Sequence, residues 1–456
     1  MPAATRHEKA AFDALDIWLA HRVRFGGLPG VQVCARKNGA VLFSQAYGMA
    51  NAAKKEKYTT RHAGHIASHS KMFTACLTLQ LMEQGVLSIY DPAVLHLPWL
   101  NKHKDKRVRE ITLRDLMTHR AGLFRDGMDA SFWEQEKPFP TRAQLQAQTL
   151  AAKLVYDPNT ETKYSNFGTA LLGLALESAT GMEYADLFAE HILPKLPGAV
   201  LTPDYGLRPR IKYAAGNSRK IFDQKSRQLR NEPAKALAPA TGFCGTAEST
   251  TQFLHTLLQT DKLLPQCMRR EVAHLNWKVR NMATESYGYG MIFSGIGEDV
   301  YIGHSGGYPG FGSQTRLLKG TDYVFSAIMN STEFDSLAII RTMADLIRKV
   351  ESVFATDRKI EVSPVVMNKW GSWQYIVGGK SAIALMSDMP SPADAPQILQ
   401  RRRDGNYYAD KANGFTNVGE PVSFIRKAGK IVAVKSGANT LYPADEFLKR
   451  AKKTLA

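Results

Sequence analysis

Residues 68–82 read SHSKMFTACLTLQLM, and this stretch indicates the architecture of the chain more strongly than any other. Ser68 and Lys71 open an apolar run, and three residues apart on a helix they lie on one face, with roughly 5–6 Å between Cβ atoms. An amine so placed can activate a serine hydroxyl as a nucleophile. Burial disfavours the charged form of a lysine, so the pattern predicts a partly neutral, basic Lys71. Ser70 points about 100° away around the helix and is not the nucleophile candidate.

A second motif, Tyr164-Ser165-Asn166, is the only Tyr-x-Asn in the chain. It follows a turn-rich stretch and precedes an amphipathic segment that begins near Phe167. One interpretation is that Ser165 or Asn166 simply caps that helix. The other is catalytic: a phenol beside a cationic lysine is favoured as phenolate and can move a proton between nucleophile and leaving group. In that interpretation the amide of Asn166 orients the lysine and the substrate.

A third motif, His304-Ser305-Gly306-Gly307, follows the strand-like residues 299–302. Two more strands are predicted at 313–318 and 323–329, joined by a turn at 319–322. A glycine-rich edge lets a ligand approach the backbone closely. Backbone N–H groups at such an edge can hold an oxyanion.

The same segment also matches G-x-S-x-G, the nucleophile elbow of α/β-hydrolases, at residues 303–307. That fold requires the chain order serine, acid, histidine. No histidine follows His304 in this sequence, and the surrounding pattern predicts antiparallel strands instead of a strand followed by a helix. The elbow is therefore rejected.

In this order, the three motifs resemble the serine β-lactamase and penicillin-binding-protein superfamily, and in particular its class C-like branch of DD-peptidases, D-aminopeptidases, esterases and acyltransferases. Residues 111–123, ITLRDLMTHRAGL, are similar to the LLTHTSGL segment of that family. Residues 85–92 are similar to the loop after its nucleophile helix, and residues 239–253 resemble another family segment, with its glycines replaced at 240–242. The resemblance extends from about residue 10 to residue 350.

The resemblance implies a role for each catalytic candidate. Ser68 would be the acyl-accepting nucleophile and Lys71 its activating partner. Tyr164 would be general base and acid, and Asn166 would orient the reacting groups. Which group takes the first proton is disputed among relatives. We expect His119, at a helix end, to be a packing or capping residue.

The third motif would complete this site. His304 stands where many relatives carry the lysine of Lys-Thr-Gly, and it resembles the histidine variant of some DD-peptidases and D-aminopeptidases. The family geometry implies an oxyanion hole made by the backbone amides of Ser68 and Gly307. Ser305 and Gly306 would line the substrate-binding edge.

The expected fold is α/β (α+β), with an antiparallel sheet flanked by helices plus an all-helical lobe. A helix is predicted at 9–24 and a hairpin at 31–36 and 40–47, turning at Asn38-Gly39. The chain returns to strands near 288–293 and ends this region with a helix at 335–351. Long irregular stretches at 124–140 and 203–235 are expected to overhang the cleft.

From about residue 357 the sequence changes to short alternating runs, at 370–386, 406–409 and 422–442, which predict β-strands. This part resembles the small lipocalin-like β-barrel appended to some members of the family. We therefore expect a β-lactamase-like catalytic domain at 1–354 and a β-rich domain at 355–456. The second domain can equally be a stabilising or oligomerising appendage or contribute to the site.

Composition is that of a globular protein: 456 residues, 44% hydrophobic and 22% charged. The net charge of +17 has no nucleic-acid motif beside it, so we expect no nucleic-acid partner, while steering of anionic substrates stays open. No apolar run is long enough to span a membrane and no signal-peptide pattern is visible, which favours the cytoplasm. Four scattered cysteines form no metal motif, so we expect reduced thiols, no metal and no other cofactor.

Together these observations predict a cofactor-independent serine hydrolase or acyl transferase that forms an acyl-enzyme on Ser68. Small amides or esters are the expected substrates, and a D-amino-acid peptide bond is the sharper hypothesis. The alternatives are a promiscuous carboxylesterase, or a thioesterase or peptide macrocyclase. A β-lactamase is less favoured because such enzymes act outside the cytoplasm, and a non-catalytic ligand-binding scaffold is less favoured because the motifs are intact. The sequence does not address the oligomeric state.

Overall fold

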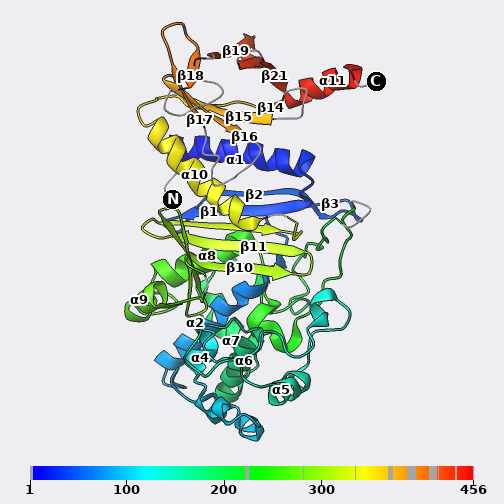
Figure 1. Ribbon diagram of the computed structural model, residues 1–456, viewed down its shortest axis with the longest axis vertical. Helices are drawn as coiled ribbons and strands as arrows, with labels where there is room; N and C mark the ends of the chain where they lie inside the picture. The colour runs from blue at the N-terminus through cyan, green and yellow to red at the C-terminus, as the bar shows by residue number, and fades with distance from the viewer. Residues whose placement is uncertain are drawn as a thin grey trace. The chain divides into compact units, whose positions relative to one another are not determined.

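The computed structural model describes residues 4–220, 225–280, 282–333, 335–367, 373–387, 397–409, 419, 421–436 and 439–454. The chain forms two compact units (Figure 1). The larger unit is residues 28–340, and the smaller unit is residues 1–27 with 341–456. The boundary between them falls inside helix α10 (Ser336–Val353).

The larger unit is built on a nine-stranded sheet of order β3-β2-β1-β12-β11-β10-β9-β8-β7, in which every neighbouring pair is antiparallel. Its strands are β1 (Gly30–Lys37), β2 (Ala40–Asn51), β3 (Glu56–Lys57), β7 (Asn276–Lys278), β8 (Glu285–Gly288), β9 (Ile292–Ile296), β10 (Asp299–Tyr308), β11 (Phe311–Leu318) and β12 (Tyr323–Met329). Strand β1 pairs with both β2 and β12. The β1–β2 hairpin, from the N-terminal end of this unit, is therefore joined to strands from the C-terminal end of the unit.

Two turns of this sheet depend on left-handed backbone. At the predicted first hairpin, Asn38 and Gly39 have φ of 49° and 78°, the conformation that a two-residue hairpin turn requires, so this prediction is confirmed. The predicted strand at 288–293 is wrong in its middle, because β8 ends at Gly288 and β9 starts at Ile292. Gly290, with φ of 66°, makes the turn between them.

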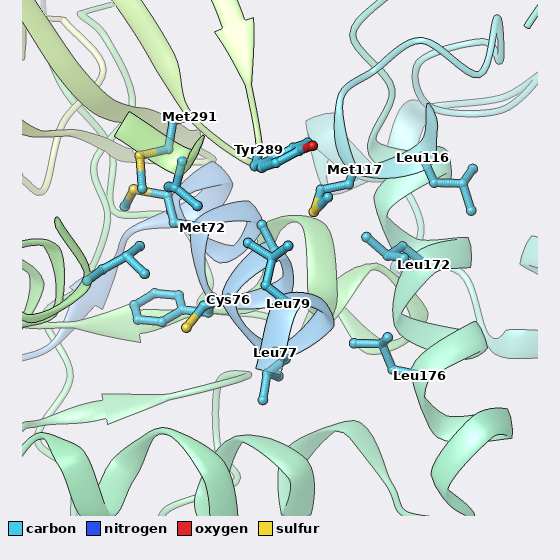
Figure 2. Close-up of a cluster of buried hydrophobic side chains, with 14 of the residues drawn as sticks. Met72, Cys76, Leu77, Leu79, Leu116, Met117, Leu172, Leu176, Tyr289 and Met291 are labelled. Atoms are coloured by element: carbon cyan, nitrogen blue, oxygen red, sulfur yellow. The ribbon is translucent and has the colours of Figure 1, made fainter. Parts of the chain in front are cut away.

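Helix α2 (Ser70–Glu83) forms the centre of the helical part, and its residues 70–81 are all buried. Its side chains pack among those of α4 (Leu113–Met117) and α6 (Asn166–Thr180) and against Tyr289 and Met291, as Figure 2 shows. Helix α7 (Tyr184–His191) also contacts it. Since residues 70–81 are buried on every side, α2 is a core helix, and the amine of Lys71 at its start is buried with it.

The other helices of this unit are α3 (Ala93–His96), α5 (Arg142–Ala151), α8 (Ala247–Gln259) and α9 (Gln266–His274). Helix α8 contacts β1, β11 and β12, and covers one face of the sheet. Figure 1 shows α2, α4, α6 and α7 grouped next to β10. The predicted antiparallel sheet with flanking helices and a helical lobe is confirmed.

In the part of the chain that the structure describes, the smaller unit contains α1 (Arg6–Phe25), the rest of α10, nine strands and α11 (Ala444–Thr454). The strands are β13 (Glu361–Val362), β14 (Val366–Met367), β15 (Trp373–Gly378), β16 (Ala382–Ser387), β17 (Gln397–Arg401), β18 (Tyr407–Ala409), β19 (Pro421–Lys427), β20 (Lys430–Ser436) and β21 (Asn439–Pro443). Pairing of β15 with both β14 and β16 closes β14–β21 into a barrel.

The barrel interior is apolar, and its core consists of Val366, Ile376, Ile383, Leu399, Val422, Val434 and Leu441. The predicted β-rich region is confirmed, including its hairpin, formed by β19 and β20. Residues 370–372 and 437–438 of the predicted strands lie outside the described residues. Among the described helices, none has an apolar stretch long enough to cross a bilayer.

Candidate active site

Ser68 lies in a single 3₁₀ turn, Ala67–His69, that leads directly into α2. The turn is strained, because Ala67 is a non-glycine residue with φ of 49°, a conformation that costs about 1–3 kcal/mol. Two hydrogen bonds hold it: His69 Nδ1 donates to the Ile66 carbonyl at 2.7 Å, and Ser70 Oγ donates to the Ala67 carbonyl at 2.6 Å. Ser68 itself is only half-buried, so the turn presents its hydroxyl outward while its neighbours are locked inside.

Lys71 is 1% exposed, and its Nζ atom lies 3.2 Å from Ser68 Oγ. The same nitrogen donates to Asn166 Oδ1 and to the Ala240 carbonyl, each at 2.7 Å. Burial lowers the pKa of Lys71 well below its ordinary value. A neutral amine has two hydrogens, which these two acceptors use, so its lone pair is left for the proton of Ser68.

Tyr164 is the second residue in contact with Ser68, since its hydroxyl donates to Ser68 Oγ at 2.6 Å. Its ring centre lies 4.6 Å from Lys71 Nζ. Burial raises the pKa of the Tyr164 phenol. The expected preference for phenolate is therefore wrong for the resting protein, because burial outweighs the hydrogen bond to Ser68 and the charge of Arg125, which act on the Tyr164 pKa in the opposite direction. The structure favours a protonated phenol that donates to Ser68 Oγ.

The helix-cap interpretation of Tyr-x-Asn holds for Ser165, while the catalytic interpretation stays a prediction supported by the contacts of Asn166. Ser165 caps α6, since its Oγ accepts from the Gly168 N–H at 2.8 Å. Asn166 uses its side chain in the site: Oδ1 accepts from Lys71, and Nδ2 donates to Asp126 Oδ1 at 2.6 Å. Asp126 is buried and thereby fixes the orientation of the Asn166 amide. Sequence reasoning missed Asp126, because nothing in its local pattern distinguishes it from other aspartates.

His304 lies in β10 and is 1% exposed. Burial lowers its pKa well below the ordinary histidine value, so its ring is neutral. Nδ1 lies 2.6 Å from the Ser305 carbonyl, which can only accept, so Nδ1 carries the proton. Nε2 then accepts from the Tyr287 hydroxyl at 3.1 Å. The ring centre of His304 is 6.4 Å from that of Tyr164, so it borders the Ser68 group as an uncharged side chain.

His119 packs directly against the site. Its ring centre is 4.3 Å from that of Tyr164 and 4.4 Å from that of Tyr287. Nδ1 accepts from the Ser165 N–H at 3.3 Å, and burial lowers the pKa of the imidazole well below its ordinary value. The residue is held at φ of 60°, which is unusual for a non-glycine. The packing role expected for His119 thus places it behind the Tyr164 ring, where it limits how that ring can move.

Strand β10 also brings the glycine motif to the nucleophile turn. A Cβ atom on Gly306 would lie 2.1 Å from the Ile66 carbonyl oxygen and 2.5 Å from Ser313 Oγ. At Gly307, which is exposed, a Cβ atom would meet no atom within 4 Å. Gly306 therefore permits the close approach of β10 to the turn before Ser68. Gly307 borders open space, the position that an amide donor to a substrate needs.

These two glycines allow a matched test. Gly306→Ala is expected to destabilise the fold by about 1–3 kcal/mol, because backbone atoms block the added methyl group. Gly307→Ala should leave folding stability unchanged, since its methyl group enters open space. Thermal unfolding of both variants beside the wild type measures the difference. Equal melting temperatures for the two variants would contradict the close packing of β10 on this turn.

The chain resembles known proteins over most of its length. Residues 15–348 match the model of the family described as Beta-lactamase. Penicillin-binding protein 4* of Bacillus subtilis is 29% identical over 310 residues, which is 64% of this chain and 65% of that protein. The chain spans between about one third and two thirds of the length of the first curated relatives it matches.

Two solved structures share the fold. A D-stereospecific amidohydrolase from Streptomyces superimposes with a TM-score of 0.63 and 22% identity, covering 73% of this chain and 98% of that one. The octameric penicillin-binding protein homologue from Pyrococcus abyssi has a TM-score of 0.65 and 18% identity, covering 94% of this chain and 99% of that one. The second match includes the region that carries the C-terminal barrel.

Proposed function

Because the chain belongs to the beta-lactamase family, we propose that it is a serine hydrolase or acyl transferase that forms an acyl-enzyme on Ser68. The observation that carries the proposal is the double contact of one hydroxyl. Ser68 Oγ lies within hydrogen-bonding distance of both Lys71 Nζ and the Tyr164 hydroxyl. A nucleophile with a base on one side and a proton donor on the other is what acyl transfer requires.

In the proposed acylation, Ser68 Oγ attacks the carbonyl carbon while its proton passes to the neutral amine of Lys71. The backbone amides of Ser68 and Gly307 would hold the oxyanion, a contribution typically worth 10²–10³ in rate. As the intermediate collapses, Tyr164 gives its proton to the leaving group and recovers one from the Lys71 ammonium. Asn166 holds the amine in place throughout, since its own amide is fixed by Asp126.

Deacylation repeats these steps with an incoming water or amine. Tyr164 and Lys71 remove the proton of the incoming nucleophile, and Ser68 Oγ recovers a proton when the acyl bond breaks. Every group involved comes from the chain itself, so the proposed cycle uses no cofactor. The proposed substrates are small molecules or peptides, and no nucleic-acid or membrane partner enters it.

Within this reaction class, we favour small amides and esters, with D-amino-acid amide or peptide bonds as the sharper choice. Two observations support that choice. One is the fold shared with a D-stereospecific amidohydrolase. The other is His304, a buried neutral ring in a position where many relatives carry a lysine. The neutral His304 ring supplies no positive charge to bind a substrate carboxylate. This favours amides over peptides whose free C-terminus would lie next to His304.

The stereochemical prediction is tested with the amides of D- and L-phenylalanine, by chromatographic measurement of released amino acid. We expect kcat/KM for the D-amide to exceed that for the L-amide by at least about tenfold, because a chiral site held by several fixed groups discriminates by more than about 1.4 kcal/mol. The Ser68→Ala variant supplies the background rate. Equal rates for the enantiomers together with rapid ester hydrolysis would instead identify a carboxylesterase, and no turnover of amides or esters would contradict the proposed function.

A further inference from the structure

Arg125 is a cation at the edge of the Ser68 group. Its guanidinium carbon lies 5.8 Å from the centre of the Tyr164 ring, and its side chain is 65% exposed. The charge is close enough to act on Lys71, whose pKa it helps to lower. The proposed acylation gives Arg125 no task. An exposed guanidinium next to the reacting groups therefore needs another explanation.

Arg125 is fixed at both ends. Its carbonyl accepts the backbone N–H groups of Asn166 at 2.9 Å and Phe167 at 3.2 Å, which ties its backbone to the first residues of α6. Its Nε atom pairs with Asp126 Oδ2 at 2.9 Å, and the other oxygen of that buried carboxylate accepts from Asn166. The position of the guanidinium is thus set by the same two residues that orient Lys71.

This arrangement leaves the outer part of the guanidinium for a ligand. Asp126 occupies the Nε side, and no residue in the described part of the chain accepts from Nη1 or Nη2. Two parallel N–H donors in one plane match the two oxygens of a carboxylate, and such bidentate pairs are directional and strong. A fixed guanidinium also loses less conformational freedom on binding than a mobile one.

The segment 205–235 adds positive charge to the strand side of the same site. The Tyr308 hydroxyl, one residue beyond Gly307, donates to the Glu232 carbonyl at 2.8 Å, and the Asn217 N–H donates to the Gly310 carbonyl at 3.2 Å. The acidic residues of this segment are Asp223, which lies outside the described residues, and Glu232. Its exposed basic residues are Arg208, Arg210, Lys212, Arg219, Lys220, Lys225, Arg227, Arg230 and Lys235. Such a field raises the local concentration of anions.

We propose that Arg125 binds a carboxylate on the acyl part of the substrate, so that an acyl donor carrying such a carboxylate is preferred over its neutral counterpart. The proposal rests on the acyl-enzyme function above and names its substrate class. The carboxylate is held through its two oxygens by Nη1 and Nη2, beside Tyr164. The basic segment 205–235 increases the rate of encounter without touching the reacting bond.

The test uses two p-nitrophenyl esters of equal length, the glutarate monoester with a free carboxylate and its terminal carboxamide. The measured quantity is the ratio of kcat/KM for the carboxylate over the carboxamide. We expect the wild-type ratio to be about 10–100, the range of a hydrogen bond to a charged group. The Arg125→Gln variant should have a ratio close to 1. The Arg125→Lys variant should have an intermediate ratio, because lysine keeps the positive charge as a point charge without the planar pair of donors. Because each ratio is taken within one variant, a general loss of activity cancels.

Arg270 provides the control, since it is an exposed arginine on α9 in the same unit. Arg270→Gln removes the same charge and should retain the wild-type ratio. Raising the ionic strength from about 0.02 to 0.2 M should lower the ratio in the wild type, because salt screens the attraction. A wild-type ratio near 1 would overturn the inference, and so would an Arg125→Gln ratio equal to that of the wild type. In either case, Ser68-dependent turnover of the carboxamide ester would still support the proposed function. No turnover of either ester would refute both.

Discussion

Replacement of Ser68 by alanine is expected to lower kcat/KM for p-nitrophenyl butyrate by at least ~10³-fold. The ester is undemanding about its acyl group, so the measurement tests the nucleophile before specificity. The Ser68 hydroxyl accepts from the Tyr164 hydroxyl at 2.6 Å and lies 3.2 Å from Lys71 Nζ. Without it the base and the proton donor remain, but no atom can form the acyl bond. The rate of p-nitrophenolate release from variant and wild type purified side by side gives the result.

Ser70→Ala is the matched control. Ser70 Oγ is buried, donates to the Ala67 carbonyl and accepts from the Phe243 N–H at 3.1 Å. Its loss should lower the melting temperature, since a buried donor and acceptor lose their partner, while the folded fraction remains active. Ser68→Ala should show the reverse, an unchanged melting temperature without activity. Equal ester hydrolysis by Ser68→Ala and wild type would rule out an acyl-enzyme on Ser68 for this reaction.

Replacement of Lys71 by methionine is expected to reduce kcat by ~10³-fold or more, because a general base and a charge partner are lost together. Methionine keeps the length of the buried side chain and removes the nitrogen that bonds Asn166 and the Ala240 carbonyl. Lys71→Arg should be as inactive as Lys71→Met, since a guanidinium stays protonated and cannot accept the Ser68 proton. An active Lys71→Arg variant would show that positive charge, and not basicity, is what the reaction needs.

The dependence of rate on pH provides a second measurement for Lys71. The amine acts only after it loses its proton, so the wild-type rate should rise with pH and then level off. Burial lowers the pKa of Lys71, which places this rise below the ordinary lysine range. The midpoint belongs to the coupled Lys71–Tyr164 pair and not to either group alone. In Lys71→Met this rise should disappear from the residual rate.

The catalytic candidates were predictable because their order and spacing form a pattern that few chains contain. The structure places Ser68 in contact with Lys71 and Tyr164, and Lys71 in contact with Asn166. Their roles in a reaction stay a proposal until the substitutions are measured. The domain boundary at 354/355 also stays a prediction.

The partners of these residues were not predictable. Asp126 is separated from Asn166 by 40 positions and Tyr287 from His304 by 17, and no local pattern marks either contact. The sequence predicts a partly neutral Lys71 from the apolar run around it, and burial does lower the pKa of that amine. The protonated phenol of Tyr164 was not predictable, because it is buried by side chains distant in the sequence, such as His119 and Tyr287. No sequence pattern marked Arg125, because its place beside Tyr164 depends on the hydrogen bonds between its backbone and the start of α6.

The pairing of β1 with β12 has a consequence for the synthesis of this protein. His304 and Gly307 lie on β10, which reaches the β1–β2 hairpin only through β11 and β12. A ribosome therefore has to deliver residues up to Met329 before the sheet can be joined and the site assembled. Contacts between such distant segments also make folding slow. Nascent chains and fragments that end before Met329 should therefore lack Ser68-dependent turnover of p-nitrophenyl butyrate.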